Sequence, residues 1–225
     1  MRYTLPILAC LVGLTSSSFS ATVTWAAAEV SELRLPGGAL VGSGNLVRLG
    51  YFKVSPEIVQ QNGSNIAFLN ENFEEFGSAR IGEGFGGTAG EFAKTSTQPA
   101  AATQFDGKQM YVWGFASGDN STVQSSLSTA THHGIFYMTG GPNSNRDLQD
   151  PEWLFPNASG LDGESSIDLA DLTFDSTRLN QGARVLVGDF FTGEDFLLAA
   201  IPEPSSAALL SMAAVLVVGR RRQRC

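Results

Sequence analysis

Apolar and polar residues alternate over short stretches through most of residues 21–201, and this period of two is typical of β-strands. These stretches are rich in β-branched and aromatic residues, and segments with glycine, proline and asparagine separate them. The pattern predicts strands at 22–30, 46–54, 109–116, 134–139, 153–155, 184–191 and 195–201. We therefore expect a mainly β fold, a β-sandwich-like single domain.

Two short helices are expected in the N-terminal third of this domain. Ser55 and Pro56 supply an N-cap and a proline at the first helical position, and Gly63 ends that helix. Asn65 caps a second helix, which ends at Gly77 and has apolar residues at spacings of three and four: Ile66, Leu69, Phe73 and Phe76. The fold thus carries a short two-helix insertion. Residues 33–45 and 78–103 are expected to form loops.

One of these loops contains a motif that is associated with dinucleotide binding. Residues 82–87 (GEGFGG) match the pattern G-x-G-x-x-G. A dinucleotide site needs a strand before the glycines and a helix after them, so that the pyrophosphate meets helix N–H groups. Because residues 88–97 have no helical apolar period, we interpret the motif as a flexible loop.

Composition and charge limit the classes of protein to consider. The 225 residues include 14 basic and 22 acidic side chains, which gives a net charge of −8 and excludes bulk attraction to nucleic acid. A hydrophobic fraction of 43% with only 16% charged residues is too apolar for a disordered chain. The chain is therefore expected to fold, and its two ends differ in composition from the rest.

Residues 1–20 have the layout of a secretory signal peptide. A short positive start at 1–3 precedes the apolar run 5–14 and the small, polar stretch 15–20. Small residues lie three and one positions before Ala21, as a signal peptidase requires, so we expect cleavage between Ser20 and Ala21. The expected partners are the secretion translocon and signal peptidase. The alternative is a buried N-terminal strand.

Residues 202–225 contain three successive elements. Pro202, Glu203 and Pro204 form an extended, exposed segment, because proline fixes φ and lacks a backbone donor. The apolar run 207–219 would be about 20 Å long as a helix, shorter than the roughly 30 Å hydrocarbon core of a membrane. The arginine cluster that follows would stay on the cytoplasmic side: Arg220, Arg221, Arg222 and Arg224. We expect a transient inner-membrane anchor, the alternative being an ordinary C-terminal core helix.

This order of Pro-Glu-Pro, short hydrophobic helix and arginine cluster resembles the PEP-CTERM sorting signal. The resemblance covers Pro202 to Cys225, with Ser206 where many members have threonine. It implies that exosortase, a membrane-embedded transpeptidase-like enzyme of Gram-negative bacteria that make exopolysaccharide, recognises the tail and removes or exchanges it after export. Stretches of the body at 45–50, 76–80 and 133–136 also resemble uncharacterised exosortase substrates, which implies no particular activity.

Without its two ends, the body 21–201 has nine basic and 21 acidic side chains, a net charge of −12. Such a surface repels DNA and anionic sugars and favours cations or neutral glycans. Both cysteines, Cys10 and Cys225, lie in segments that we expect to be lost. The mature domain would then have no disulfide, and its core alone would stabilise it.

Candidates for catalysis are few. His132 and His133 are the only histidines, whereas a zinc site takes three or four spaced ligands and adjacent strand residues face opposite sides. We therefore expect no metal or catalytic site and interpret the pair as a turn leading into strand 134–139. The sequence has no G-x-S-x-G elbow for a nucleophilic serine. An exported hydrolase that uses one of the histidines is the least favoured alternative.

Two binding functions stay open. No cofactor is expected, but carboxylates could supply a loop-type calcium site: Asp168, Asp171 and Asp175, or Asp189, Glu194 and Asp195. Otherwise these carboxylates are solvated between strands. Four aromatic residues are candidates for a sugar-stacking platform, although most are expected inside the core: Tyr111, Trp113, Tyr137 and Trp153.

The sequence as a whole favours a non-enzymatic, exported protein that exosortase sorts to the cell surface or to the biofilm and exopolysaccharide matrix. Its role there would be structural or adhesive. The alternative is a carbohydrate-binding module that holds exopolysaccharide.

Overall fold

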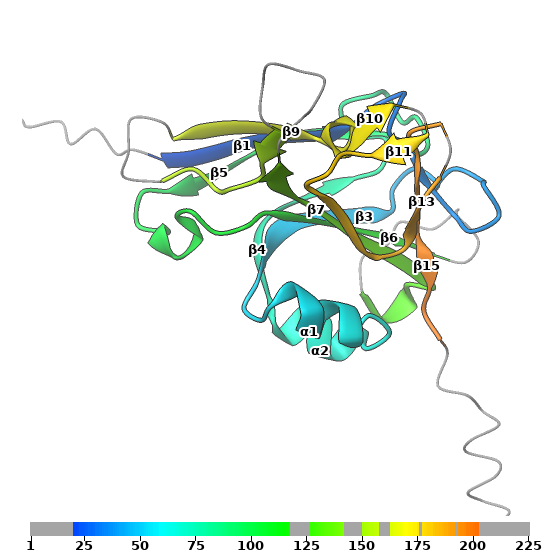
Figure 1. The fold of residues 1–225 in the computed structure, drawn as a ribbon, viewed down its shortest axis with the longest axis horizontal. Coiled ribbons are helices and arrows are strands. Elements are labelled where there is room, and N and C mark those ends of the chain that lie inside the picture. The colour runs from blue at the N-terminus through cyan, green and yellow to red at the C-terminus, as the bar shows by residue number, and fades with distance from the viewer. Residues whose placement is uncertain are drawn as a thin grey trace, which may run out of the picture.

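The structure, a computed structural model, describes residues 20–117, 127–141, 150–157, 163–175, 177–191 and 193–202 (Figure 1). It is mainly β with two short helices, which confirms the expected mainly β class. The predicted signal peptide before Ser20 and the predicted tail helix lie outside the described residues.

A large antiparallel sheet forms the middle of the fold. Its strands follow the order β12 (Ala183–Val187), β7 (His132–Gly141), β6 (Tyr111–Ala116), β3 (Leu46–Phe52) and β4 (Phe73–Arg80). Two short strands, β8 (Asp150–Glu152) and β15 (Ala199–Ala200), also pair with β7.

A second sheet has the order β5 (Phe92–Pro99), β1 (Ser20–Ala27) and β9 (Glu164–Asp168), with β1 antiparallel to β5 and parallel to β9. Two smaller sheets complete the β structure. One contains β10 (Thr173–Asp175) and β11 (Arg178–Leu179), and the other contains β13 (Asp189–Phe190), β14 (Phe196–Leu197) and β2 (Leu33–Arg34).

The helices are α1 (Pro56–Gln61) and α2 (Ile66–Glu71), and they lie together below the central sheet in Figure 1. Single 3-10 turns are η1 (Thr103–Phe105), η2 (Leu127–Thr129) and η3 (Leu169–Leu172).

Both faces of the central sheet are buried. One core lies between this sheet and the β1 sheet and includes Trp25 and Phe92 from the β1 sheet and Phe136 from β7. The other lies between the central sheet and the helices, where Val59 and Leu69 pack on sheet aromatics. Every residue of β6 is buried as a result, since alternate side chains enter the two cores.

The buried side chain of Arg48 links α2 to the central sheet. The Arg48 guanidinium on β3 lies 4.7 Å from the centre of the Phe73 ring and 5.3 Å from that of Trp113. It donates to the side chain of Asn70 at 2.8 Å and to Glu75 at 2.5 Å. The charge is thus paired, and the aromatic rings replace part of its hydration.

The prediction of a helix over 65–76 is only partly right. The helix begins after the Asn65 cap but ends at Glu71, and Phe73 and Phe76 belong to β4. Phe73 enters the core beneath the helices and Phe76 enters the other core. A spacing of three fits one face of a helix, but it also fits opposite faces of a strand that is buried on both sides.

Most other expected elements are confirmed, including the first helix and strands near 22–30, 46–54, 109–116 and 134–139. The expectation of a loop over 78–103 is wrong, because β5 lies within it. Its threonines face outward, where Thr95 and Thr97 hydrogen-bond Thr24 and Thr22 of β1 at 3.0 and 3.1 Å. Outward threonines instead of apolar residues hid the strand period.

Three further boundaries differ from expectation. Residues 33–45 are mainly loop but include β2. Residues 153–155 follow β8 and form no strand beyond a bridge of Leu154 to Gln109. The expected strand 184–191 is split into β12 and β13 at Gly188, which has a φ of +98°, and 195–201 is split into β14 and β15.

Gly50 tests the packing of the central sheet. A Cβ at this position would overlap the carbonyl oxygen of Glu74 and the Phe73 ring, where a bulge shifts the register of β3 against β4. We expect Gly50→Ala to lower the free energy of unfolding by about 1–3 kcal/mol in denaturant titrations. Gly37→Ala is the control, since nothing lies within 4 Å of its Cβ. Equal stabilities of the two variants would contradict the packing.

Candidate functional site

The last described strand lies just before the predicted sorting motif. In β15, Ala199 and Ala200 pair with His133 and His132 of β7. The backbone N–H of Ile201 then donates to the Thr131 carbonyl at 2.7 Å, and Pro202 follows as an exposed residue. Glu203, Pro204 and the four tail arginines lie outside the described residues. The first proline of the motif thus lies directly after the last described backbone hydrogen bond.

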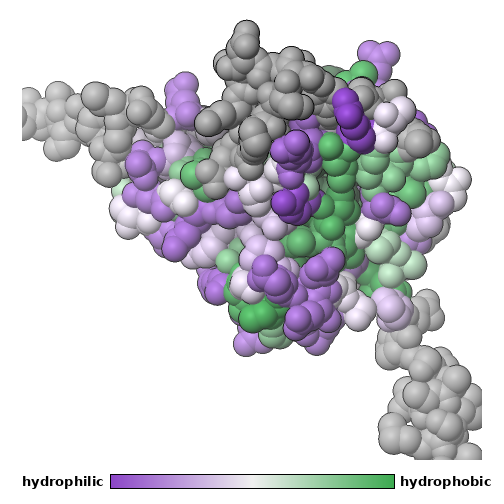
Figure 2. Space-filling view, in the orientation of Figure 1, coloured by the Kyte–Doolittle hydropathy of each residue, from purple (hydrophilic) through white to green (hydrophobic). Residues whose placement is uncertain are grey.

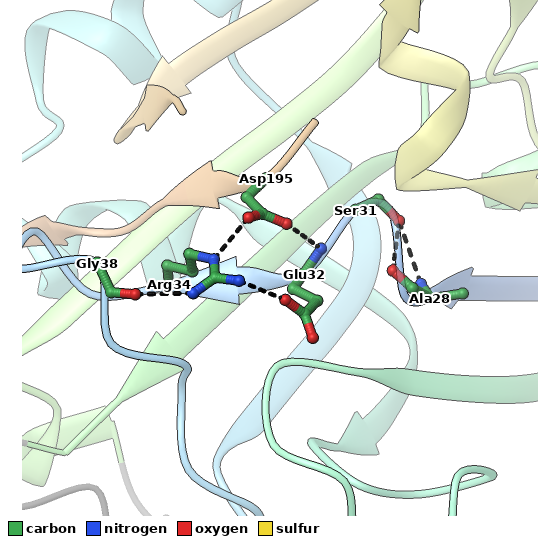
Figure 3. Close-up of polar contacts among 6 residues, drawn as sticks. All are labelled: Ala28, Ser31, Glu32, Arg34, Gly38 and Asp195. Atoms are coloured by element: carbon green, nitrogen blue, oxygen red, sulfur yellow. Dashed lines mark hydrogen bonds and ion pairs between the residues drawn. The ribbon is translucent and has the colours of Figure 1, made fainter. Parts of the chain in front are cut away.

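A charged network holds the segment just before this exit (Figure 3). Arg34 on β2 donates from Nε to Asp195 at 2.6 Å and from one terminal nitrogen to Glu32 at 2.6 Å. Its other terminal nitrogen donates to the Gly38 carbonyl at 2.8 Å. The second oxygen of Asp195 accepts the Glu32 backbone N–H at 3.1 Å. All three nitrogens of Arg34 are therefore hydrogen-bonded, and Nε links β2 with the residue before β14.

Backbone hydrogen bonds extend this link. The N–H groups of Phe196 and Leu198 donate to the carbonyls of Glu32 and Arg34 at 3.0 and 2.8 Å. Burial raises the pKa of Glu32, and the Arg34 charge opposes that shift while Asp195 and Glu91 add to it. The segment 195–201 is therefore held first to β2 and then to β7.

The other predicted processing point lies in β1. Ser20 begins the strand opposite Pro99, and Ala21 pairs with Gln98 and is fully buried. The Thr22 N–H donates to the Gly163 carbonyl at 2.6 Å. Cleavage between Ser20 and Ala21 would leave a strand from Ala21 to Ala27. Because this bond lies within a paired strand, a peptidase would have to cut it before β1 joins its sheet.

His133 is a buried structural group in this fold. Its ring nitrogen Nδ1 accepts the indole N–H of Trp113 at 3.0 Å. An indole nitrogen only donates, so the proton lies on Nε2, which donates to the Gly63 carbonyl at 2.7 Å. Both nitrogens are therefore occupied. His132 is half-buried and contacts the Thr131 hydroxyl at 2.9 Å.

The carboxylates considered for calcium have other partners. Asp168 accepts from the N–H of Ala170 and the hydroxyl of Ser31, and Asp171 accepts from the Asp168 N–H and the Trp153 indole. Asp195 is paired with Arg34. The side chain of Asp175 lies outside the description. Within the described part of the chain, three or more potential metal ligands do not gather at any point.

The second carboxylate group lies around the turn between β13 and β14. Asp189 accepts the backbone N–H of Phe190 at 2.8 Å. Glu194 is half-buried, and its φ of +75° is in the left-handed region that disfavours residues other than glycine. Asp189 and Glu194 therefore belong to the turn itself, while Asp195 pairs with Arg34 of β2.

The four aromatic residues considered for a sugar platform do not present their faces to solvent. Tyr111 and Tyr137 are 4% and 5% exposed, and Trp113 and Trp153 are fully buried. All but Trp153 belong to the core beneath the helices. The structure thus corrects the stacking-platform hypothesis, because these rings fill both sides of a sheet.

The glycine motif at 82–87 is a tight connection between strands. Strand β4 precedes it, but β5 follows, where a dinucleotide site requires a helix. Several of its N–H groups are used within the loop, as when the Gly87 N–H donates to the Gly82 carbonyl at 2.9 Å. The motif therefore lacks the helix terminus that would bind a pyrophosphate.

Figure 2 shows an apolar band on one face of the body, between the polar surface of the helices and the β10–β11 hairpin. The large hydrophobic side chains that are exposed lie far apart in the sequence: Val30, Ile58, Leu154 and Phe191. No helix within the described ranges is long and apolar enough to cross a membrane.

Comparison with known proteins gives no relative. No protein-family model matches the chain, and no curated protein or solved structure is significantly similar to it.

Sequence reasoning did not find the Arg34 network. Residues 33–45 were expected to be a loop, and Asp195 was considered only as a calcium ligand. The pairing of β2 with β14 brings together residues about 160 positions apart, and no local period indicates such a contact. The only hint in the sequence was an arginine between two leucines, Leu33-Arg34-Leu35, since a charge within an apolar stretch needs a partner.

The Arg34 network yields a stability prediction. Asp195→Asn removes the charge that pairs with a partly buried guanidinium, so we expect the free energy of unfolding to fall by about 1–3 kcal/mol. Glu74→Gln breaks the exposed ion pair with Lys53 and should cost less than about 1 kcal/mol. Denaturant titration measures both. Equal costs would show that Asp195 does not hold this segment.

His133 yields a prediction of pH dependence. Burial lowers its pKa from 6.5 to about 4, against an opposing effect of the Gly63 carbonyl. Below pH 6.5 the unfolded chain takes up a proton that the folded chain excludes. Stability from this group is therefore complete above about pH 6.5 and falls towards pH 4, by about 3 kcal/mol in total.

His133→Gln removes this titration while its amide still offers one acceptor and one donor. We expect unfolding free energies measured from pH 7.5 to 4 to fall less steeply in this variant. His132→Gln is the control, and it should keep most of the wild-type slope. If the slope were lost in the control and kept in His133→Gln, the assignment of the titrating group would be wrong.

Proposed function

We propose that this protein is exported through a cleaved signal peptide, is held transiently in the inner membrane by its C-terminal tail, and is sorted by exosortase to the cell surface or the exopolysaccharide matrix. There its sandwich-like body has a structural or adhesive role. The observation that carries the proposal is the succession of Pro202-Glu203-Pro204, the apolar run 207–219 and four arginines.

The geometry of the exit supports this proposal. An enzyme that cuts or exchanges the tail needs an extended, accessible backbone. Pro202 is exposed and follows a segment that β7 and β2 hold in place. Removal of the tail beyond Pro202 would break none of the described backbone hydrogen bonds of the body. The body could therefore keep its fold after processing.

The contacts of the two histidines favour a structural role over that of an exported hydrolase. His133 has both ring nitrogens hydrogen-bonded inside the core, and His132 contacts Thr131. Among the residues that the structure describes, neither histidine is paired with a serine and an acid in the manner of a triad.

The proposal predicts the fate of motif variants in the native host. Replacing Glu203 and Pro204 by alanine should leave the tail attached and the protein in the inner membrane, because the groove of exosortase would lose the segment that it recognises. Fractionation and immunoblotting measure the location. Pro36→Ala, an exposed proline in a loop of the body, is the control and should reach the surface or matrix. Normal processing of the motif variant would contradict the proposal.

A further inference from the structure

The last described backbone hydrogen bond of the body leaves no spacer before the predicted sorting motif. The Ile201 N–H donates to the Thr131 carbonyl at 2.7 Å, and Pro202 is the next residue. Three extended residues span about 10 Å, so no bond within 202–204 lies farther than that from Ile201. A compact body of this length has a radius of gyration of about 16 Å. The body therefore lies close enough to hinder an enzyme that must take the motif into a groove.

Strand β15 is held to β7 by small side chains and a short run of pairing. Ala199 and Ala200 are its only two paired positions. Ala200 is exposed and Ala199 is partly buried, and an alanine side chain has little apolar area to lose. Ile201 is also only partly buried. Release of residues 199–201 would thus expose little apolar surface, and short peripheral elements of this kind open locally without global unfolding.

The segment before β15 is held more firmly. Leu198 is 1% exposed, and its N–H donates to the Arg34 carbonyl at 2.8 Å. Phe196 is fully buried, and its ring centre lies 5.1 Å from that of Phe136. Asp195 is paired with the Arg34 guanidinium. An opening that starts at Pro202 should therefore stop at Leu198.

We propose that β15 regulates the processing of the tail. It separates from β7 before the sorting enzyme binds the motif, and residues 199–204 then enter the enzyme as one extended segment. Six extended residues span about 20 Å in place of about 10 Å, which exceeds the radius of gyration of the body. The paired and the released states are in equilibrium, and only the released state is a substrate. This inference rests on the proposed function, because it concerns how the same motif is presented.

A disulfide between the two strands tests this step. Ala200 and His132 lie opposite each other in an antiparallel pair, where the Cα atoms are about 4.5–5.5 Å apart, a separation that a disulfide accepts. All variants carry Cys225→Ser, so that the tail thiol takes no part. We expect Ala200→Cys/His132→Cys, expressed as the full chain in the native host, to lose its tail about tenfold or more slowly in pulse–chase labelling, because the released state is no longer populated.

The two single variants, Ala200→Cys and His132→Cys, are the matched controls. Each changes one side chain without joining the strands, so each should be processed at the rate of the Cys225→Ser parent. Gel mobility with and without reductant shows whether the disulfide has formed in the double variant.

An inserted spacer separates this effect from misfolding. Gly-Ser-Gly-Ser between Ile201 and Pro202 supplies about 13 Å of flexible chain while β15 stays paired. In the disulfide variant this insertion should restore the processing rate of the parent. The same insertion after Gly37, in an exposed loop of the body, is the control and should not restore it.

Processing of the disulfide variant at the parent rate would overturn the inference. A slow rate that the spacer does not relieve would overturn it as well, since the disulfide would then act through something other than access to the motif. Failure of the proposed function gives a different result. The tail would then stay on the parent and on every variant, including the spacer variant, and both proposals would be wrong.

Discussion

The burial of both faces of the central sheet is the constraint on which the rest of the structure depends. A sheet with one solvent-exposed face needs one apolar layer packed against it. This sheet needs two such layers, and the β1 sheet and the helix pair supply them. Strand β6 is therefore apolar throughout, and a glycine lies where the two sheets approach closely, at Gly77 of β4, whose Cβ would overlap Ser96 of β5. Two polar groups that this arrangement buries have partners inside the fold: Arg48 lies on the aromatic rings, and His133 lies between Trp113 and Gly63.

The same constraint explains what the sequence could predict. Strands such as β3 and β6 and the cap of α1 follow from local residue types, and so does the mainly β class. Phe73 and Phe76 were assigned to a helix because a strand buried on both faces loses the alternation that identifies it. Strand β5 was missed for the opposite reason, since its outward threonines give it a polar appearance.

The candidate sites divide in a similar way. The predicted sorting motif at Pro202 is a contiguous signal, so its order of elements is visible in the sequence. The links of Arg34 to Asp195 and of Tyr111 to Tyr137 and Arg184 are formed by strand pairing between distant segments. The tyrosines were singled out for an exposed ring face that the core does not provide.

We propose that the chain is a body between two removable ends, and β1 and β15 are the first and last described strands of that body. The most direct test is the intact mass of the protein from its native host with and without exosortase. The account predicts a mature species that starts at Ala21 and ends near Pro202, found at the surface or in the matrix only when exosortase is present. A species that retains the full tail in both strains would contradict it and would make the C-terminus an ordinary membrane anchor.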